Sequence, residues 1–449
     1  MATAFGSAAG PAVPPPGAAT GPADSGRRGG TEVPAGRRDR RGRGVALLVF
    51  AALAAALAAS VGPTPTTLFE FSRADAAIAV PALPIRVVPV AVVVAVLLVL
   101  AGLFLLARPV SRRITTTVLS AGLLGLLVVF IAWAGTTGSA GASIDLLGLL
   151  QNTVYLAVPL ALGALGGVLC ERSGVINVAI EGQLLVGAFA GALVGTLAHS
   201  AWAGSLAAVG AGAVIGAVLA VLAIRFTVNQ VIIGVVLNVF ALGLTSFLFN
   251  AVMQQAPDTR NLPDVFGAVD VPLLRDIPIL GPLLFQANVL VYATYVLIIV
   301  VQLGLSRTRW GLRTRAVGEY PRAAASAGIR VLRIRYVNTM LGGGVAGLGG
   351  AYLTLGSAGS FSPNMTAGKG FIALAAVIFG SWRPLAAVGA GTFFAFTFAL
   401  QLVLTVVNTP VPIPSEVFTM LPYLATLLAV AGLVGRVRAP AADGVPYRP

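Results

Sequence analysis

Polar side chains that could contact a solute are rare in this sequence and concentrate around position 180. Glu181 is the clearest carboxylate within a long apolar stretch, and Asn177 and Gln183 lie close to it. Asn177 and Glu181 are four residues apart, which on a helix would place them on one face. Amides and a carboxylate are suitable partners for a solute rich in hydrogen-bonding groups that must cross lipid. The structural alternative is that Glu181 pairs with Arg172 or bonds a neighbouring helix.

Three further polar positions are candidates for the same pathway. Asn238 and Thr245 are seven residues apart, which again gives one helix face. Gln401 interrupts an otherwise apolar segment, and Asn364 lies in a turn before Gly370. The pathway candidates are therefore Asn177, Glu181, Gln183, Asn238, Asn364 and Gln401, against ordinary packing or loop roles.

The residue combinations that would make this chain an enzyme are missing. The segment Ala367-Gly-Lys-Gly370 approaches a phosphate-binding loop, but no Gly stands five positions before Gly368, and Gly370 replaces the Ser or Thr that would hold Mg²⁺. One histidine, His199, and one cysteine, Cys170, cannot form the usual clustered metal site or an intrachain disulfide. We therefore predict no catalytic residue, no metal site and no ATP site in this chain.

The composition indicates a protein that crosses a membrane many times. Of the 449 residues, 57% are hydrophobic and only 10% are charged, and runs of about 20 apolar residues recur. The net charge of +14 does not indicate nucleic-acid binding, because the cations lie between apolar runs. We expect an all-α polytopic bundle of about 10 to 12 helices. The twelve candidate spans are residues 45–61, 85–107, 114–134, 147–169, 175–198, 202–224, 230–252, 285–305, 336–355, 370–379, 385–407 and 417–434.

Basic residues predict the orientation of the chain, because cytoplasmic loops carry an excess of Lys and Arg. A cytoplasmic N-terminus places all but five of the 29 basic residues inside, the five being Arg73, Arg86, Arg260, Arg275 and Lys369. Residues 1–44 form a tail rich in Arg, Pro and Gly that we predict to be disordered. Residues 436–449 form a second cytoplasmic tail. Segment 370–379 is short for a span and is either a broken crossing or re-entrant.

A basic loop between two spans, residues 306–335, has an ordered pattern. Gly318 ends one helical stretch, Pro321 suits the start of the next, and Gly328 stops it. A short helix with small residues on one side and arginines on the other suits docking into a groove on a soluble partner. The alternative is a loop that only fixes the topology.

Several ordered blocks resemble one family of importer subunits. The segment Leu312–Ile329 resembles the coupling loop of the permeases of ABC importers for branched-chain amino acids and simple sugars. Within that family, three blocks resemble the bacterial nucleoside permeases: Glu171–Gln183, Gly347–Leu353 and Ser360–Gly380. The resemblance implies a type II ABC importer permease core at residues 147–435, preceded by extra helices at 45–134. It also implies a nucleoside as cargo in the cytoplasmic membrane of a bacterium.

The resemblance further implies the partners. They are an ATPase subunit that binds ATP and Mg²⁺, a second permease that is a different chain, and a lipid-anchored substrate-binding protein. The residues expected to couple to the ATPase are Arg313, Ala316, Gly318, Glu319, Pro321, Ala323, Ala324 and Gly328. Tyr320 departs from the family, which usually has Asn there, so a helix cap is lost. Ser381-Trp-Arg-Pro384 also departs from the common Arg-Trp-x-Pro.

Other functions remain as alternatives. The cargo of such a permease could be a simple sugar or a branched-chain amino acid. An ion-coupled secondary transporter would need intramembrane acids or a sodium site at the midplane, for which Glu181 alone gives thin support. An integral-membrane enzyme is disfavoured by the missing chemistry.

Overall fold

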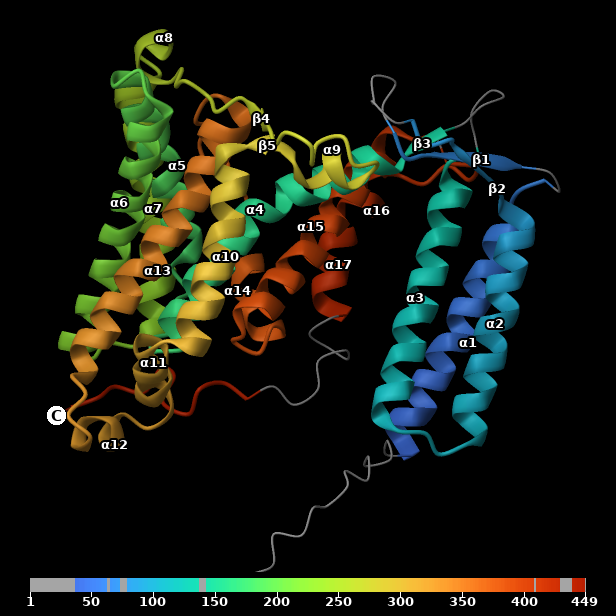
Figure 1. Ribbon diagram of the computed structural model, residues 1–449, viewed down its shortest axis with the longest axis horizontal. Coiled ribbons are helices and arrows are strands. Elements are labelled where there is room, and N and C mark those ends of the chain that lie inside the picture. Colours follow the sequence, from blue (N-terminus) through green and yellow to red (C-terminus); the bar gives the residue numbers. More distant parts are fainter. Residues whose placement is uncertain are drawn as a thin grey trace, which may run out of the picture. The chain divides into compact units, whose positions relative to one another are not determined.

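The computed structural model describes residues 37–62, 65–72, 79–136, 143–407, 409–428 and 438–448. Within these residues, nine helices are long and apolar enough to cross a membrane. They are α1 (Arg37–Ala59), α2 (Val87–Ala107), α3 (Arg112–Ala134), α4 (Leu146–Glu171), α5 (Ile180–Leu197), α6 (Ala201–Ala220), α7 (Gln230–Leu248), α10 (Val289–Arg307) and α15 (Pro384–Val406). Short π-helical turns extend α6 to Arg225 and α7 to Met253. The predicted polytopic helical fold is confirmed (Figure 1).

A tenth long helix, α13 (Val331–Leu353), is less hydrophobic because it is rich in glycine. The remaining helices are short: α8 (Pro257–Arg260), α9 (Leu280–Leu284), α11 (Arg309–Glu319), α12 (Pro321–Ser326), α14 (Lys369–Phe379), α16 (Ser415–Thr419) and α17 (Leu421–Leu428). The last predicted span, 417–434, is interrupted at Met420, and its final residues lie outside the described part. Ten of the twelve predicted spans therefore correspond to long helices among the described residues.

The chain forms two compact units. The first unit contains most of α1, the C-terminal two thirds of α2 and the first part of α3. These helices pack around a core of Leu47, Ala51, Leu98 and Leu105. Helix α1 begins at Arg37, so residues 37–44 are helical. The predicted tail, residues 1–44, therefore includes the start of α1. Residues 1–36 of that tail lie outside the described part. The second unit contains residues 54–93 and everything described from Leu127 onward.

Short strands lie in the connections of the second unit. Strand β1 (Thr66–Glu70) pairs antiparallel with β2 (Leu83–Arg86) and parallel with β3 (Ser143–Asp145). Strands β4 (Ala268–Asp270) and β5 (Gln286–Asn288) form an antiparallel pair. Asp145, the last residue of β3, also caps α4, because its carboxylate accepts a hydrogen bond from the Gly148 N–H at 2.7 Å.

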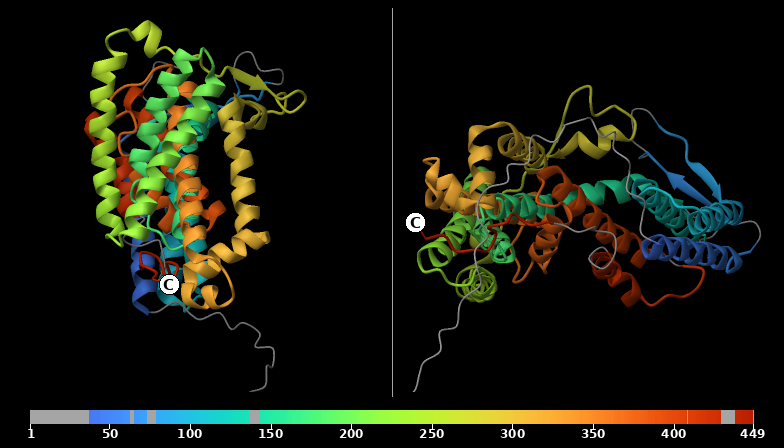
Figure 2. Two further views of the ribbon diagram at one scale, coloured as in Figure 1. Left: turned by 90° about the vertical axis from the view of Figure 1, so that its left-hand side faces the viewer. Right: turned by 90° about the horizontal axis from the view of Figure 1, so that it is seen from below.

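Helix α4 is the centre of the second unit. In its most apolar stretch 83% of the residues are buried, against 28% for α10 and 39% for α6. Its core partners come from α13, α14 and α15, and include Ala346, Ala373, Val377 and Phe394. A helix that is apolar all round must be surrounded by protein or lipid, and here the protein surrounds it (Figures 1 and 2).

Helices α5, α6 and α13 pack closely through glycine. A side chain at Gly347 would collide with the backbone of Ala208 and Gly212, and one at Gly187 would collide with Gly347 itself. Gly343 similarly faces Gly212. In lipid, such small residues let backbones approach. The glycines of these three helices therefore have a packing role.

The second unit has two distinct ends. Helices α11 and α12 lie at one end together with residues 172–174, 380–383 and 438–448; we call this the α11 end. Helices α8 and α9 lie at the opposite end, the α9 end (Figure 1). The left view of Figure 2 also places the C-terminus beside the α11 and α12 hairpin.

Two membrane-crossing segments are broken. Residues 172–179 are not α-helical, so α5 begins at Ile180 rather than near 175 as predicted, and its start lies against Gly163 in the body of α4. The chain from Phe361, near the α9 end, to Trp382, at the α11 end, is helical only in α14. Segment 370–379 is thus the helical half of a crossing.

Candidate substrate pathway and coupling surface

Glu181 joins the two broken segments. Its carboxylate accepts hydrogen bonds from the Thr366 hydroxyl at 2.6 Å, the Gly368 N–H at 2.8 Å and the Gly370 N–H at 2.6 Å. Gly368 adopts φ +83°, which only glycine adopts without strain, and this turns the backbone N–H groups of the α14 start toward the acid. A carboxylate at a helix N-terminus is also favoured by the helix dipole. The acid is only 8% exposed.

Asn177 and Gln183 form a closed amide pair beside this junction. The Asn177 amide donates to Gln183 Oε1 at 3.0 Å, and the Gln183 amide donates to Asn177 Oδ1 at 3.3 Å. Both side chains are fully buried. Because Asn177 precedes α5, it does not share a helix face with Glu181, and that part of the prediction is wrong.

Asn238 of α7 bonds the backbone around the start of α5. Its side chain accepts from the Gly182 N–H at 2.8 Å and donates to the Val178 carbonyl at 2.9 Å. Both partners belong to a region where the helix ladder is incomplete, so the amide satisfies backbone groups that would otherwise be unpaired. Thr245 is buried on the same helix, as its spacing from Asn238 predicts.

The structure therefore brings together four of the six pathway candidates. Asn364 is exposed in a turn with φ +58°, two residues before Thr366, and makes no bond to Glu181. Gln401 lies half-buried on α15, and its neighbour Leu400 packs in a different core cluster with Phe418. No hydrogen bond among the described residues joins Gln401 to the other candidates.

Arg172 does not pair with Glu181. Its Nε donates to the Trp382 carbonyl at 2.7 Å, which ties the end of α4 to the turn between α14 and α15. Burial lowers the pKa of Arg172, and nearby Arg315 and Arg383 act in the same direction. Glu181 instead bonds the start of the neighbouring helix α14.

The basic loop folds into the α11–α12 hairpin. Thr308 caps α11 by accepting the Gly311 N–H at 3.1 Å, whereas the Tyr320 side chain provides no such cap for α12. Val317, Ala324 and Val331 form a small core inside the hairpin. The eight predicted coupling residues divide accordingly: Gly318 and Ala324 are buried, Ala316 and Pro321 are half-buried, and Arg313, Glu319, Ala323 and Gly328 are exposed.

Gly318 is where the hairpin meets the bundle. A side chain at this position would collide with the Arg172 carbonyl, so only glycine permits the approach. Residues 172–179 lead directly from this contact to Glu181. The hairpin and the junction of the broken segments are therefore linked through a short, non-helical piece of chain.

The C-terminal segment is docked on the bundle, which the sequence did not reveal. Residues 438–448 belong to the predicted cytoplasmic tail, and the Ala442 N–H donates to the Gly318 carbonyl at 2.8 Å. Arg335, only 2% exposed, donates to the carbonyls of Val445 at 2.9 Å and Ala442 at 3.4 Å. The only available signal was Arg335 itself, a cation adjoining an apolar span that needs a partner.

Asp443 lies in this docked segment near Arg335 and Glu171. Burial and the Glu171 carboxylate raise the pKa of Asp443 to about 8, although the Arg335 guanidinium opposes them. Glu171 itself accepts a hydrogen bond from the indole N–H of Trp382. The end of α4, the start of α13 and the C-terminal segment therefore share one buried polar cluster.

These features define a class of protein: a polytopic helical membrane protein with two broken segments and a basic helical hairpin at one end. Within the described ranges, no cluster of three or more His, Cys, Asp or Glu side chains could hold a metal ion.

Comparison with known proteins gives the family. Residues 149–430 match the model of the branched-chain amino acid transport system permease component, and the chain belongs to this family. The chain is 40% identical over 309 residues to the guanosine ABC transporter permease protein NupQ of Bacillus subtilis, covering 67% of this chain and 96% of that protein.

It is 37% identical over 311 residues to the nucleoside ABC transporter permease protein NupC of Lactococcus lactis, with the same coverage. It is also 36% identical over 255 residues to a putative glucose ABC transporter permease protein of Haloferax volcanii, covering 57% of this chain and 77% of that one. No solved structure matches. Members of the family are transport subunits rather than enzymes, as predicted for this chain.

Proposed function

We propose that this chain is the membrane-spanning permease subunit of an ATP-driven importer for nucleosides. The observation that carries the proposal is the 40% identity to a guanosine permease across nearly the whole of that protein. The exposed hairpin supports it, because it offers a rigid basic surface to a partner.

The hairpin contacts suggest how a motor subunit would drive transport. An ATPase that binds ATP and Mg²⁺ would grip the exposed residues Arg313, Glu319, Ala323 and Gly328. Its movement would pass through Gly318 to the Arg172 backbone, and from there along residues 172–179 to Glu181. Since Glu181 holds the start of α14, a shift of this short piece would move both broken segments together.

The broken segments are also the proposed place of the substrate. Irregular backbone inside a membrane is tolerated where it lines a cavity or is surrounded by protein, and transporters place binding sites at such half-helices. A nucleoside carries no net charge but many donors and acceptors, which suit Asn177, Glu181, Gln183 and Asn238. Asn364 would meet cargo at the α9 end, and Gln401 would contribute from α15.

The proposed assembly has three further components. A second permease, a different chain, completes the passage; a lipid-anchored binding protein delivers cargo at the α9 end; and the ATPase docks at the α11 end. The arginines of the hairpin share the α11 end with Arg172 and Arg383, so this end is cytoplasmic in the proposed arrangement. The N-terminus is then cytoplasmic too, because eight crossing helices, an even number, precede the hairpin in the described part of the chain.

Uptake of radiolabelled guanosine into cells or proteoliposomes tests the proposal. The Gly318→Ala and Glu319→Ala variants should lose ATP-dependent uptake and the co-purifying ATPase while retaining the folded helices. Gly210→Ala is the matched control, because nothing lies within 4 Å of the added carbon. Uptake that persists without the ATPase and collapses with the proton gradient would instead indicate a secondary transporter.

A sugar is the second candidate cargo, since a putative glucose permease is 36% identical. Competition decides between them. A nucleoside is the cargo if unlabelled adenosine or inosine inhibits guanosine uptake and glucose does not. Glucose uptake without nucleoside uptake would instead identify a sugar as the cargo.

A further inference from the structure

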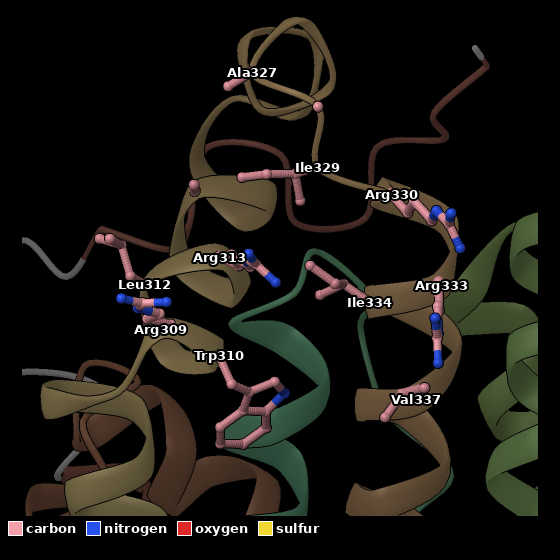
Figure 3. A pocket seen from close by; sticks show the side chains of 12 residues that line it. Arg309, Trp310, Leu312, Arg313, Ala327, Ile329, Arg330, Arg333, Ile334 and Val337 are labelled. Carbon is pink, nitrogen blue, oxygen red and sulfur yellow. The ribbon is translucent and has the colours of Figure 1, made fainter.

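An arginine-lined cavity of about 1140 Å³ opens between α11 and the start of α13. Arg309 and Arg313 of α11 face it from one side, and Arg330 and Arg333 face it from the other (Figure 3). Trp310 also lines the cavity, and its indole N–H is anchored to Asn338 Oδ1 at 3.1 Å. No acidic residue lines it.

The four guanidinium groups are uncompensated. All four residues are exposed, and no hydrogen bond or ion pair joins their side chains to any other residue in the described ranges. Like charges that line one hollow favour an anionic ligand, and guanidinium groups match the geometry of phosphate.

An apolar groove lies farther along α13, in its membrane-crossing part. Val337 lines the cavity, while Met340, Leu341, Gly344 and Leu348 line a second hollow of about 330 Å³. Positions three and four residues apart share one helix face, so the two hollows follow each other along α13. The other wall of the groove comes from Val209 and Ala213 of α6 and Leu297 of α10, and no polar side chain lines it.

The path from Val337 in the cavity to Leu348 at the far end of the groove matches the length of one lipid chain. Val337 and Leu348 are eleven residues apart, which corresponds to about 16 Å along a helix. Half of the hydrocarbon core of a bilayer is about 15 Å thick. Indole side chains are also enriched at the membrane–water boundary, which is where Trp310 would lie.

We propose that this hollow binds one anionic phospholipid, with the phosphate of the headgroup held by Arg309, Arg330 and Arg333, and an acyl chain in the groove. A soluble phosphate would leave the groove empty. An acidic partner protein would meet the arginines but would not enter the apolar part. Because α11 belongs to the coupling hairpin, bound lipid would hold the hairpin against α13.

Native mass spectrometry of the purified protein tests the headgroup contact. With phosphatidylglycerol added, one lipid per chain should remain bound in the mass spectrum. Phosphatidylcholine should not replace this lipid. Arg330→Gln combined with Arg333→Gln should weaken the binding at least about tenfold, since each arginine near an anionic lipid contributes about 1 kcal/mol. Arg225→Gln combined with Arg383→Gln is the control, because it removes the same charge from exposed sites outside the cavity.

A second pair of variants tests the groove. Ala213→Phe should fill it and reduce retention of long-chain phosphatidylglycerol, whereas Val214→Phe, on the 61% exposed neighbour outside the groove, should not. Glycerol phosphate in solution should fail to compete. Equal retention of phosphatidylcholine, full competition by glycerol phosphate, or loss of the ATPase without loss of lipid in the arginine variant would each overturn the proposal.

Discussion

At the scale of single residues, the buried charges of this protein hold irregular backbone in place. Glu181 satisfies two N–H groups at the start of α14, and Arg335 satisfies two carbonyls of the C-terminal segment. A buried charge is tolerated when it is paired or well hydrogen-bonded. In both places the charged side chain replaces the bonds that a continuous helix would have made for itself.

Glu181→Gln should weaken the junction of the broken segments. The amide keeps one acceptor but directs an NH₂ group at backbone donors, so we expect a loss of about 1.5–3 kcal/mol of stability, the value of a hydrogen bond to a charged group. Thermal unfolding in detergent measures this loss, and uptake should fall with it. Glu416→Gln, on an exposed carboxylate, is the control. A change of substrate preference with unchanged stability would assign Glu181 to substrate contact instead.

Asp443 should make docking of the C-terminal segment pH-dependent. Its pKa is raised from an ordinary value of about 4 to about 8, so the docked state favours the neutral acid. The stabilisation is complete at low pH and is lost as the pH rises through about 8. A spin label at Arg448→Cys should therefore become progressively more mobile as the pH rises from about 4 to about 8.

Asp443→Asn should keep that label immobile across the same range, because the amide stays neutral. Asp264→Asn, on an exposed carboxylate at the α9 end, should keep the original transition. A transition that Asp443→Asn leaves unchanged would show that another group controls docking.

At the scale of elements, close backbone contact replaces side-chain packing. Helices α5, α6 and α13 meet through Gly187, Gly212, Gly343 and Gly347. Lipid tails are as apolar as leucine, so helices in a membrane gain little by burying leucine and more by approaching closely. This explains why α13, one of the longest helices, is the least apolar of the long helices in the second unit.

Gly347→Val should separate α13 from α6. The added carbon would collide with the Ala208 backbone, which cannot move without shifting the helix. We expect a destabilisation of about 1–3 kcal/mol or more, typical of overpacking. Gly210→Val, which has nothing within 4 Å of its added carbon, should be neutral. Equal unfolding temperatures for the two variants in detergent would contradict the close approach.

At the scale of the whole molecule, the charge distribution sets the predicted orientation. The single native cysteine, Cys170, is buried, so its replacement by alanine provides a background for labelling. In that background, Ser326→Cys on α12 should react with a membrane-impermeant maleimide only after the cells are opened. Thr259→Cys on α8 should react in intact cells. The reverse pattern would invert the topology and remove the ATPase from the hairpin.

Much of this architecture is readable from the sequence. Among the described residues, ten of the twelve predicted spans correspond to long helices, because long runs of apolar residues favour membrane crossing. The hairpin boundaries follow from Gly318, Pro321 and Gly328, which act on the local backbone. The start of α5 was misplaced, since Val175 to Ala179 are mostly apolar and hydropathy does not distinguish a buried irregular stretch from a helix.

The sequence by itself therefore determined the features that depend on local backbone preference and on the solvent. These are the spans, the charged loop and the rarity of polar groups in lipid. Only the tertiary structure decided which polar groups meet, that Glu181 reaches Gly368 and Gly370 from nearly two hundred residues away, and that the C-terminal segment docks on Arg335. The physical reason is that hydropathy and backbone preference act over a few residues, whereas a buried polar group must be satisfied by whatever partner the folded chain brings within hydrogen-bonding distance.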